Sequence, residues 1–260
     1  MRAILLAAIL GLSSPAFARI DPATFSSFAF RQHPGAQLPI DASFVDEQGR
    51  SVTLAEEIAG RPAIVVLEYL RCQNLCSLVL SGAVSALGRA KLTPGKDLSL
   101  IALSIDPRDT PKESAAAQGM YSRRFADPLA ASHGIHFLTG SEGEVKRVAD
   151  AVGFPYRPDQ VSGQIAHPAG FVVITPAGKI SRYILGASPA PAALGKALGD
   201  ASLGQVTPAV HPLLLLCFGY DPDEASAAAL ALKLVRIASF AVVLLLAGLV
   251  AILSLRRRTA

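Results

Sequence analysis

The sequence predicts an α/β domain followed by a single membrane-spanning helix near the C-terminus. Between residues 37 and 203, short apolar segments rich in β-branched residues alternate with segments of helical spacing. Further along, residues 237–255 contain no charged residue and are long enough to cross a hydrocarbon core of about 30 Å. We therefore assign residues 234–255 to a transmembrane helix, separate from the folded domain.

The expected elements of the domain follow one another in a simple order. Two strongly apolar strands are expected at residues 63–69 and 98–105, and a helix from Cys76 to about Ala90 separates them. Thr110-Pro111 has the pattern of a helix start, with Thr as the cap and Pro in the first turn. The remaining elements are a helix at 143–152, hairpin strands at 170–175 and 179–184, and a final helix at 189–198.

The N-terminal 18 residues are typical of a secretory signal peptide. Arg2 precedes a short apolar core, and Ala16-Phe17-Ala18 has the small-x-small form of a cleavage site. An exported chain that meets one later stop-transfer segment leaves its C-terminus in the cytoplasm, which agrees with the three arginines at 256–258. We expect a single-pass protein whose folded domain lies on the extracytoplasmic side of the cytoplasmic membrane.

The rest of the chain divides into connecting segments. Residues 19–36 form a lead-in to the domain, residues 204–233 a stalk and juxtamembrane segment, and residues 256–260 a cytoplasmic tail. Of the 24 basic residues, Arg2 and the three terminal arginines fall outside the exported part, which leaves 20 against 20 acidic residues. This near-neutral balance argues against a nucleic-acid partner. Membrane lipid is an expected partner through the C-terminal helix.

A cysteine pair, Cys72 and Cys76, stands where the first predicted strand gives way to a helix. Thiols at a helix N-terminus meet unpaired N–H groups and the positive end of the helix dipole, which stabilise the thiolate. The two sulfurs could close into a disulfide or grip one soft metal ion together. A purely structural disulfide is the other interpretation, although so short a loop constrains the unfolded chain little.

A metal site built on two cysteines needs a further ligand, and the chain has five histidines. His33 and His211 lie outside the predicted core, and His133 and His136 are expected to be solvated surface residues. His167 stands just before the strand at 170–175 and is the candidate ligand. Taken alone, one histidine before a strand is more often structural.

The chain resembles the Sco/SenC family of thioredoxin-like copper proteins over roughly residues 37–200. The matching stretches, in order, are Phe44-Val-Asp-Glu-Gln-Gly49, the strand leading into Cys72-x3-Cys76, Ser104-Ile-Asp-Pro-Arg-Asp-Thr-Pro111, Leu138-Thr-Gly140, and His167 followed by Val173-Ile-Thr-Pro-Ala-Gly178. The resemblance implies a thioredoxin-like domain at 37–203, with a central mixed sheet flanked by helices. Each stretch alone is common, but the ordered set is specific.

The resemblance also implies a function. In this family the two cysteines and the distal histidine bind copper. The resemblance therefore implies that Cys72, Cys76 and His167 bind copper, both as Cu(I) and as Cu(II). The cysteines would in addition form a redox-active pair. The family helps to build the binuclear copper centre in cytochrome c oxidase subunit II, so the implied partners are that subunit, other copper chaperones and thiol reductants.

Some positions depart from the family pattern. Gln73 and Ser77 stand where proline is usual, and Ala166 stands where an acidic residue often precedes the histidine. The C-terminal anchor matches a bacterial subgroup, because familiar members anchor through an N-terminal helix. The residues at the copper-ligand positions are still present despite these changes. The redox potential and the target protein of other family members cannot be assigned to this chain.

Other functions fit less well. A membrane-anchored thiol–disulfide oxidoreductase without a stable metal is the main alternative, but such thioredoxin-like proteins usually have two residues between the cysteines, not three. A peroxidase needs a threonine three residues before its reactive cysteine, and here Tyr69 and Gln73 occupy those places. A pure scaffold leaves the cysteine pair unexplained.

The third cysteine, Cys217, lies in the apolar segment Leu213–Phe218, which is too short to span a membrane. An odd count leaves a thiol without an internal partner in an oxidising compartment. Cys217 is either a small apolar residue in a buried docking segment, or a transient thiol if the segment folds back beside the copper site or a partner subunit.

Overall fold

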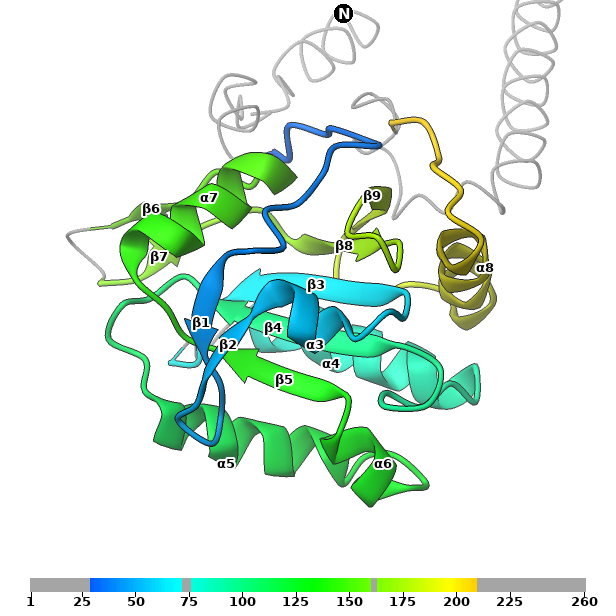
Figure 1. Ribbon diagram of the computed structural model, residues 1–260, viewed down its shortest axis with the longest axis horizontal. Helices are drawn as coiled ribbons and strands as arrows, with labels where there is room; N and C mark the ends of the chain where they lie inside the picture. The colour runs from blue at the N-terminus through cyan, green and yellow to red at the C-terminus, as the bar shows by residue number, and fades with distance from the viewer. Residues whose placement is uncertain (1–28, 72–75, 160–162, 210–260) are drawn as a thin grey trace, which may run out of the picture.

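A computed structural model describes residues 29–71, 76–159 and 163–209, and its centre is a five-stranded mixed sheet (Figure 1). The strand order is β5 (Ile135–Leu138), β4 (Ser99–Ser104), β3 (Ala63–Glu68), β8 (Gly170–Ile174) and β9 (Ile180–Leu185). Strands β3, β4 and β5 are parallel, while β8 is antiparallel to both β3 and β9. The α/β architecture predicted from the alternating pattern is confirmed.

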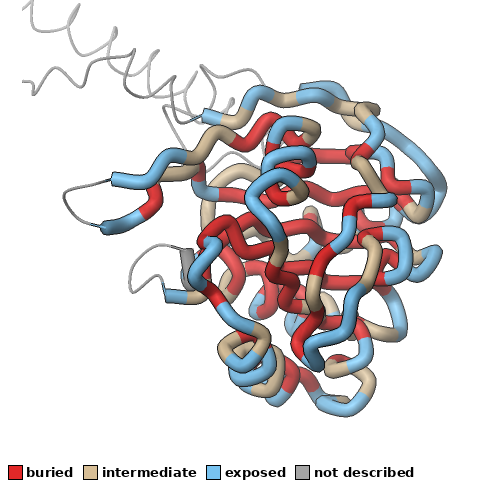
Figure 2. Tube along the Cα trace, turned by 60° about the vertical axis from the view of Figure 1, so that its left-hand side comes forward, coloured by how far each residue is buried: buried red, intermediate tan, exposed pale blue. Residues whose placement is uncertain are grey.

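Every residue of β3 and β4 is buried, which requires cover on both faces of the sheet (Figure 2). On one face, Ile64, Val66 and Leu100 pack with the apolar sides of three helices. These helices are α4 (Cys76–Arg89), α5 (Pro111–Ser122) and α8 (Pro191–Ser202). Successive side chains of a strand point to opposite faces, so the neighbours of these residues form a second core on the other side.

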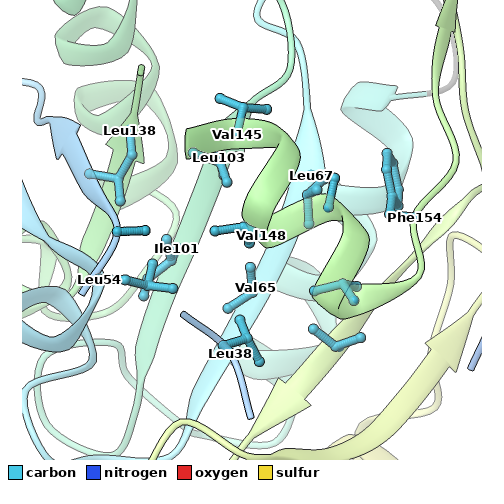
Figure 3. Close-up of a cluster of buried hydrophobic side chains, with 14 of the residues drawn as sticks. Leu38, Leu54, Val65, Leu67, Ile101, Leu103, Leu138, Val145, Val148 and Phe154 are labelled. Atoms are coloured by element: carbon cyan, nitrogen blue, oxygen red, sulfur yellow. The ribbon is translucent and has the colours of Figure 1, made fainter. Parts of the chain in front are cut away.

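The second core lies between the sheet and α7 (Glu142–Val152) (Figure 3). Val65 and Leu67 of β3 lie in one cluster with Val145 and Val148 of α7. The same face is closed by the short helix α3 (Leu54–Ile58) and by the hairpin of β1 (Ser43–Val45) and β2 (Ser51–Thr53). The predicted helix at 143–152 therefore supplies the main cover of this face.

Several boundaries agree with the sequence, and some elements were missed. Thr110 caps α5 in a reciprocal capping box with Glu113, with Pro111 in the first turn, as predicted. The last helix begins at Pro191 and continues to Ser202, because Leu198 and Ala201 still pack on the core. The missed elements are the strands β2 and β5, the short helices α3 and α6 (Pro128–Ser132), and a ribbon of β6 (Arg157–Pro158) and β7 (Ile165–Ala166). All are at most five residues long, too short to show a period.

The end of the predicted lead-in packs on the domain. The Arg31 N–H donates to the Gly153 carbonyl at 2.8 Å, and the Phe30 ring lies 5.3 Å from that of Phe154. Gly153 ends α7 with a φ of 66°, and a Cβ there would lie 1.9 Å from the Arg31 carbonyl oxygen. Glycine is therefore required at this position both by the backbone and by the close approach of the lead-in.

Within residues 29–71, 76–159 and 163–209, every helix is too short or too polar to span a bilayer. The predicted signal peptide at 1–18, the transmembrane helix at 234–255, the tail and Cys217 lie outside the described residues.

His136 is not a solvated surface residue, contrary to the sequence prediction. Its side chain is only 13% exposed, and its Nδ1 lies 2.7 Å from a carboxylate oxygen of Glu57 and 3.7 Å from one of Glu47. Gln118 and the Phe137 N–H also donate to Glu47. Burial by itself lowers the pKa of His136, but the two carboxylates raise it to about 9. The local sequence did not reveal this burial because both carboxylate partners come from distant parts of the chain.

We predict that His136→Gln destabilises the protein by about 3 kcal/mol near pH 6, because it leaves two buried carboxylates without their cation. The folded-state pKa of His136 lies above its ordinary 6.5, so its contribution is complete below pH 6.5 and is lost as the pH rises through about 9. Urea unfolding of both proteins between pH 6 and 9.5 measures this difference. The exposed His133→Gln is the control, with an expected change within about 0.5 kcal/mol. A pH-independent difference for His136→Gln contradicts the prediction.

Candidate metal centre

The predicted cysteine pair belongs to the connection between β3 and α4, at the carboxyl end of β3. Cys76 is the first residue of α4, a helix of 14 residues. Its backbone therefore stands among the N–H groups that have no acceptor within the helix, at the positive end of the helix dipole. Residues 72–75 and the side chain of Cys76 lie outside the described residues. The backbone thus has the helix start that the sequence predicts for this pair.

His167 lies at the same end of the sheet, because β8 runs antiparallel to β3. Val65 pairs with Val172 and Ile64 with Val173, so the beginning of β8 lies beside the end of β3. The ring of Tyr69, three residues before Cys72, lies 6.0 Å from the His167 ring in an edge-on arrangement. The fold therefore brings the candidate histidine to the segment that leads into the cysteine pair.

The orientation of the His167 ring is fixed by its neighbours. Its Nδ1 lies 2.9 Å from the Pro168 carbonyl oxygen, and the ring stacks on Phe154 with centroids 5.5 Å apart. A carbonyl oxygen only accepts, so Nδ1 carries the proton and Nε2 keeps the lone pair. Metal-binding imidazoles are commonly oriented in this way, by a hydrogen bond from one ring nitrogen to a carbonyl oxygen.

Partial burial lowers the pKa of His167, against the opposing effect of the Pro168 carbonyl. A neutral imidazole is the form that binds a metal ion. Two cysteine sulfurs and one imidazole would make a soft donor set that suits Cu(I). Among the described residues, which leave out both cysteine side chains, no three His, Cys, Asp or Glu side chains are grouped to hold a metal.

A buried carboxylate, that of Asp109, holds the residues that precede Cys72. Its Oδ2 accepts hydrogen bonds from the Leu70 N–H and the Ser104 hydroxyl, each at 2.7 Å. Burial raises the pKa of Asp109, and these two hydrogen bonds work in the opposite direction. The end of β3 is thereby tied to the end of β4.

Arg71, directly before Cys72, extends this network to α5. Its guanidinium donates to the Glu113 carboxylate at 3.1 Å and to the Arg108 carbonyl at 2.8 Å, and its Nε lies 3.5 Å from Asp109 Oδ1. Sequence reasoning used 104–111 as a stretch of family resemblance and as a helix start, and gave Asp109 no role of its own. The available signal was an aspartate directly before the Thr-Pro helix start, at the end of a buried strand.

Comparison with known proteins supports one family. The sequence model described as SCO1/SenC matches residues 32–198, well over half of the chain. A protein of Stutzerimonas stutzeri, provisionally named as copper-binding, is 24% identical over 133 residues, which are 50% of this chain. The match spans only 60% of the length of that curated relative.

Solved structures share the fold. An Aquifex aeolicus protein, provisionally described as an electron transfer protein, superimposes with a TM-score of 0.58 at 25% identity, covering 66% of this chain and 96% of its own. A SCO1/SenC family lipoprotein from Bacillus anthracis gives a TM-score of 0.52 at 19% identity, covering 67% and 98%. The thioredoxin-like fold with a mixed central sheet, implied by the sequence resemblance, is confirmed.

We predict that Asp109→Ala destabilises the protein by about 2 kcal/mol, because it leaves the Leu70 N–H and the Ser104 hydroxyl buried without their acceptor. Asp109→Asn retains one acceptor oxygen and should cost less. Chemical denaturation at pH 7 measures both changes. Glu142→Gln, at an exposed carboxylate, should stay within about 0.5 kcal/mol of the unmodified protein. Equal stability of the alanine variant and the unmodified protein would show that the network is unimportant.

Proposed function

The chain belongs to the SCO1/SenC family, and on that basis we propose that it binds copper as an assembly factor for cytochrome c oxidase. It would deliver copper to the binuclear copper centre of subunit II, reduce the cysteines of that centre, or do both. The observation that carries the proposal is the position of His167. Its ring is anchored through Nδ1 at the Pro168 carbonyl oxygen and stands against Tyr69, in the segment that leads into Cys72.

Copper is the cargo, and three side chains have roles in holding it. Cys72 and Cys76 supply thiolates at the start of α4, and His167 supplies the Nε2 lone pair. Two thiolates and one imidazole favour Cu(I), while Cu(II) is the second state that the site would accept. Binding requires both thiols to lose their protons, so a Cys72–Cys76 disulfide excludes the tightly bound ion.

The main alternative is a membrane-anchored thiol–disulfide oxidoreductase without a stable metal. It is favoured by the position of Cys76 at the N-terminus of α4, where the thiolate is stabilised. One thiolate would attack a disulfide of the partner and release a partner thiolate. The second cysteine would then resolve the mixed disulfide, leaving the partner reduced and Cys72–Cys76 oxidised, and a thiol reductant would restore the pair.

We also propose the cellular arrangement. The uncharged stretch at 237–255 and the arginines after it support a single C-terminal anchor in the bacterial cytoplasmic membrane, with the domain on the periplasmic side. With this arrangement the protein would belong to the C-terminally anchored bacterial subgroup. Its protein partners would be oxidase subunit II, copper chaperones and thiol reductants.

A copper titration of the reduced full chain in detergent tests the ligands. We expect one Cu(I) per chain, loss of tight binding in Cys72→Ala and in Cys76→Ala, and a Kd at least about tenfold higher in His167→Ala. After oxidation, the unmodified protein should bind Cu(I) poorly.

Two matched variants serve as controls for the titration. Cys217→Ser removes a thiol outside the proposed ligand set, and His133→Ala removes an exposed imidazole, so both should leave the stoichiometry and Kd unchanged. An unaltered absorption spectrum in Cys72→Ala would refute the ligand assignment. Reversible Cys72–Cys76 oxidation without copper binding would favour the oxidoreductase.

Protease treatment of spheroplasts tests the topology. Because we place the domain outside the membrane, added protease should remove it and leave a small membrane-embedded C-terminal fragment. A cytoplasmic marker protein should stay intact as the control. A folded domain that is protected until the spheroplasts are lysed contradicts the proposed orientation.

A further inference from the structure

The end of the domain opposite to the candidate metal centre is formed by segments far apart in sequence (Figure 1). Strands β3, β4 and β5 begin there, and the turn between β8 and β9 lies beside them. The loop after α4 contacts α6 at this end, since a Cβ on Gly95 would lie 2.1 Å from the Ala130 carbonyl oxygen. We call this surface the basic end, and its members used below are Arg89, Lys91, Leu129, Lys179, Leu203 and Val206.

The basic end carries an excess of positive charge. Arg89, Lys91 and Lys179 are exposed, and none of them lies within ion-pair distance of a carboxylate of the described residues. The carboxylates nearby are engaged, because Asp127 bonds to a lysine at 2.7 Å and Asp97 accepts a hydrogen bond from a backbone N–H at 2.8 Å. The three cations are therefore available to an anionic partner.

Exposed apolar side chains accompany these cations. Leu203 and Leu129 are 75% and 70% exposed, more than any other large apolar side chain of the described residues, and Val206 is 43% exposed. The Ser181 hydroxyl, at the start of β9, donates to the Gln205 carbonyl at 2.6 Å, which places the segment after α8 at the basic end. Leucines beside lysines and arginines are typical of protein surfaces that lie in the interfacial region of a membrane.

The described chain also leaves the domain at the basic end. The Thr207 N–H donates to the Ser181 carbonyl at 2.8 Å, at the start of β9. From there the sequence continues through residues 210–233 to the proposed anchor at 237–255. A tether of that length does not by itself fix how the domain faces the bilayer. A contact surface on the domain would decide the orientation.

We propose that the basic end lies on the anionic lipid surface of the membrane in which the chain is anchored. Arg89, Lys91 and Lys179 would meet lipid phosphates, while Leu129 and Leu203 would enter the headgroup region. Salt would weaken the contact, because exposed charges are screened. The inference rests on the proposed C-terminal anchor and does not depend on copper.

This orientation would turn the proposed copper ligands away from the membrane. Strand β3 has six residues and runs from the basic end toward Cys72, so the two ends of the sheet are about 20 Å apart. The start of α4 and His167 would then face the aqueous side. A partner protein could reach the ligands without displacing the domain from the lipid.

Photocrosslinking to lipid in nanodiscs tests the contact. The full chain would carry p-benzoylphenylalanine in place of Leu203, in discs of pure phosphatidylcholine and in discs that also contain phosphatidylglycerol. We expect about fivefold more lipid adduct in the anionic discs, measured by mass spectrometry, and a smaller difference at high salt. The same photoprobe at Leu78, a leucine that is 52% exposed near the start of α4, is the matched control and should give little adduct in either disc.

Charge reversal keeps the test decisive. Lys91→Glu together with Lys179→Glu should remove the excess of adduct from the Leu203 position in anionic discs. Lys112→Glu, at an exposed lysine near the start of α5, should leave it unchanged. Equal adduct in the two kinds of disc overturns the proposal. A crosslink only to a second copy of the chain, or only to another protein, also overturns it.

A photoprobe at Leu245, inside the uncharged stretch, separates this inference from the proposed anchor. It should label lipid in both kinds of disc. If Leu245 labels lipid and Leu203 does not, the contact surface alone is refuted. If neither position labels lipid, the anchor is refuted and the contact surface with it. The copper titration is a separate measurement, so either result leaves the proposed ligands unaffected.

Discussion

The burial of β3 between a parallel and an antiparallel neighbour is the constraint on which the rest of the structure depends. All six of its residues are buried, and β4 and β8 take up its two edges. Because β4 runs parallel and β8 antiparallel, the end of β3 meets the end of β4 and the beginning of β8. Asp109 reaches this end from the segment after β4, and His167 reaches it from the segment before β8. The directions of these three strands thus bring the parts of the candidate site to one end of the sheet.

Sequence reasoning predicted the elements with strong periodicity. The strands at 63–69 and 98–105 and the helix from Cys76 were found nearly at their predicted ends, because long apolar runs leave little choice. It missed β5 and the β6–β7 ribbon, whose stability comes from neighbouring strands and not from their own composition. His167 was selected through family resemblance, and the structure adds the neighbours that orient its ring.

The two partly buried histidines show what a local pattern leaves out. His136 and His167 are both flanked by short or apolar residues, yet one faces two carboxylates and the other faces aromatic rings and a carbonyl. Their pKa values are therefore moved in opposite directions, upward for His136 and downward for His167. His136 carries a positive charge that joins the hairpin to the sheet, whereas His167 has a neutral imidazole ring. Only the tertiary contacts separate these roles.

The aromatic contacts of the lead-in affect where a soluble form of this protein should begin. Phe30 packs against Phe154, and Phe154 stacks on His167, so three rings connect the first described residues to the proposed ligand. A recombinant domain that begins at the family match, residue 32, would keep every proposed ligand and lose Phe30. Copper affinities measured on such a shortened protein would be those of a site in which the His167 ring has lost part of its aromatic support. Differences between preparations of one protein could then arise from the choice of its first residue.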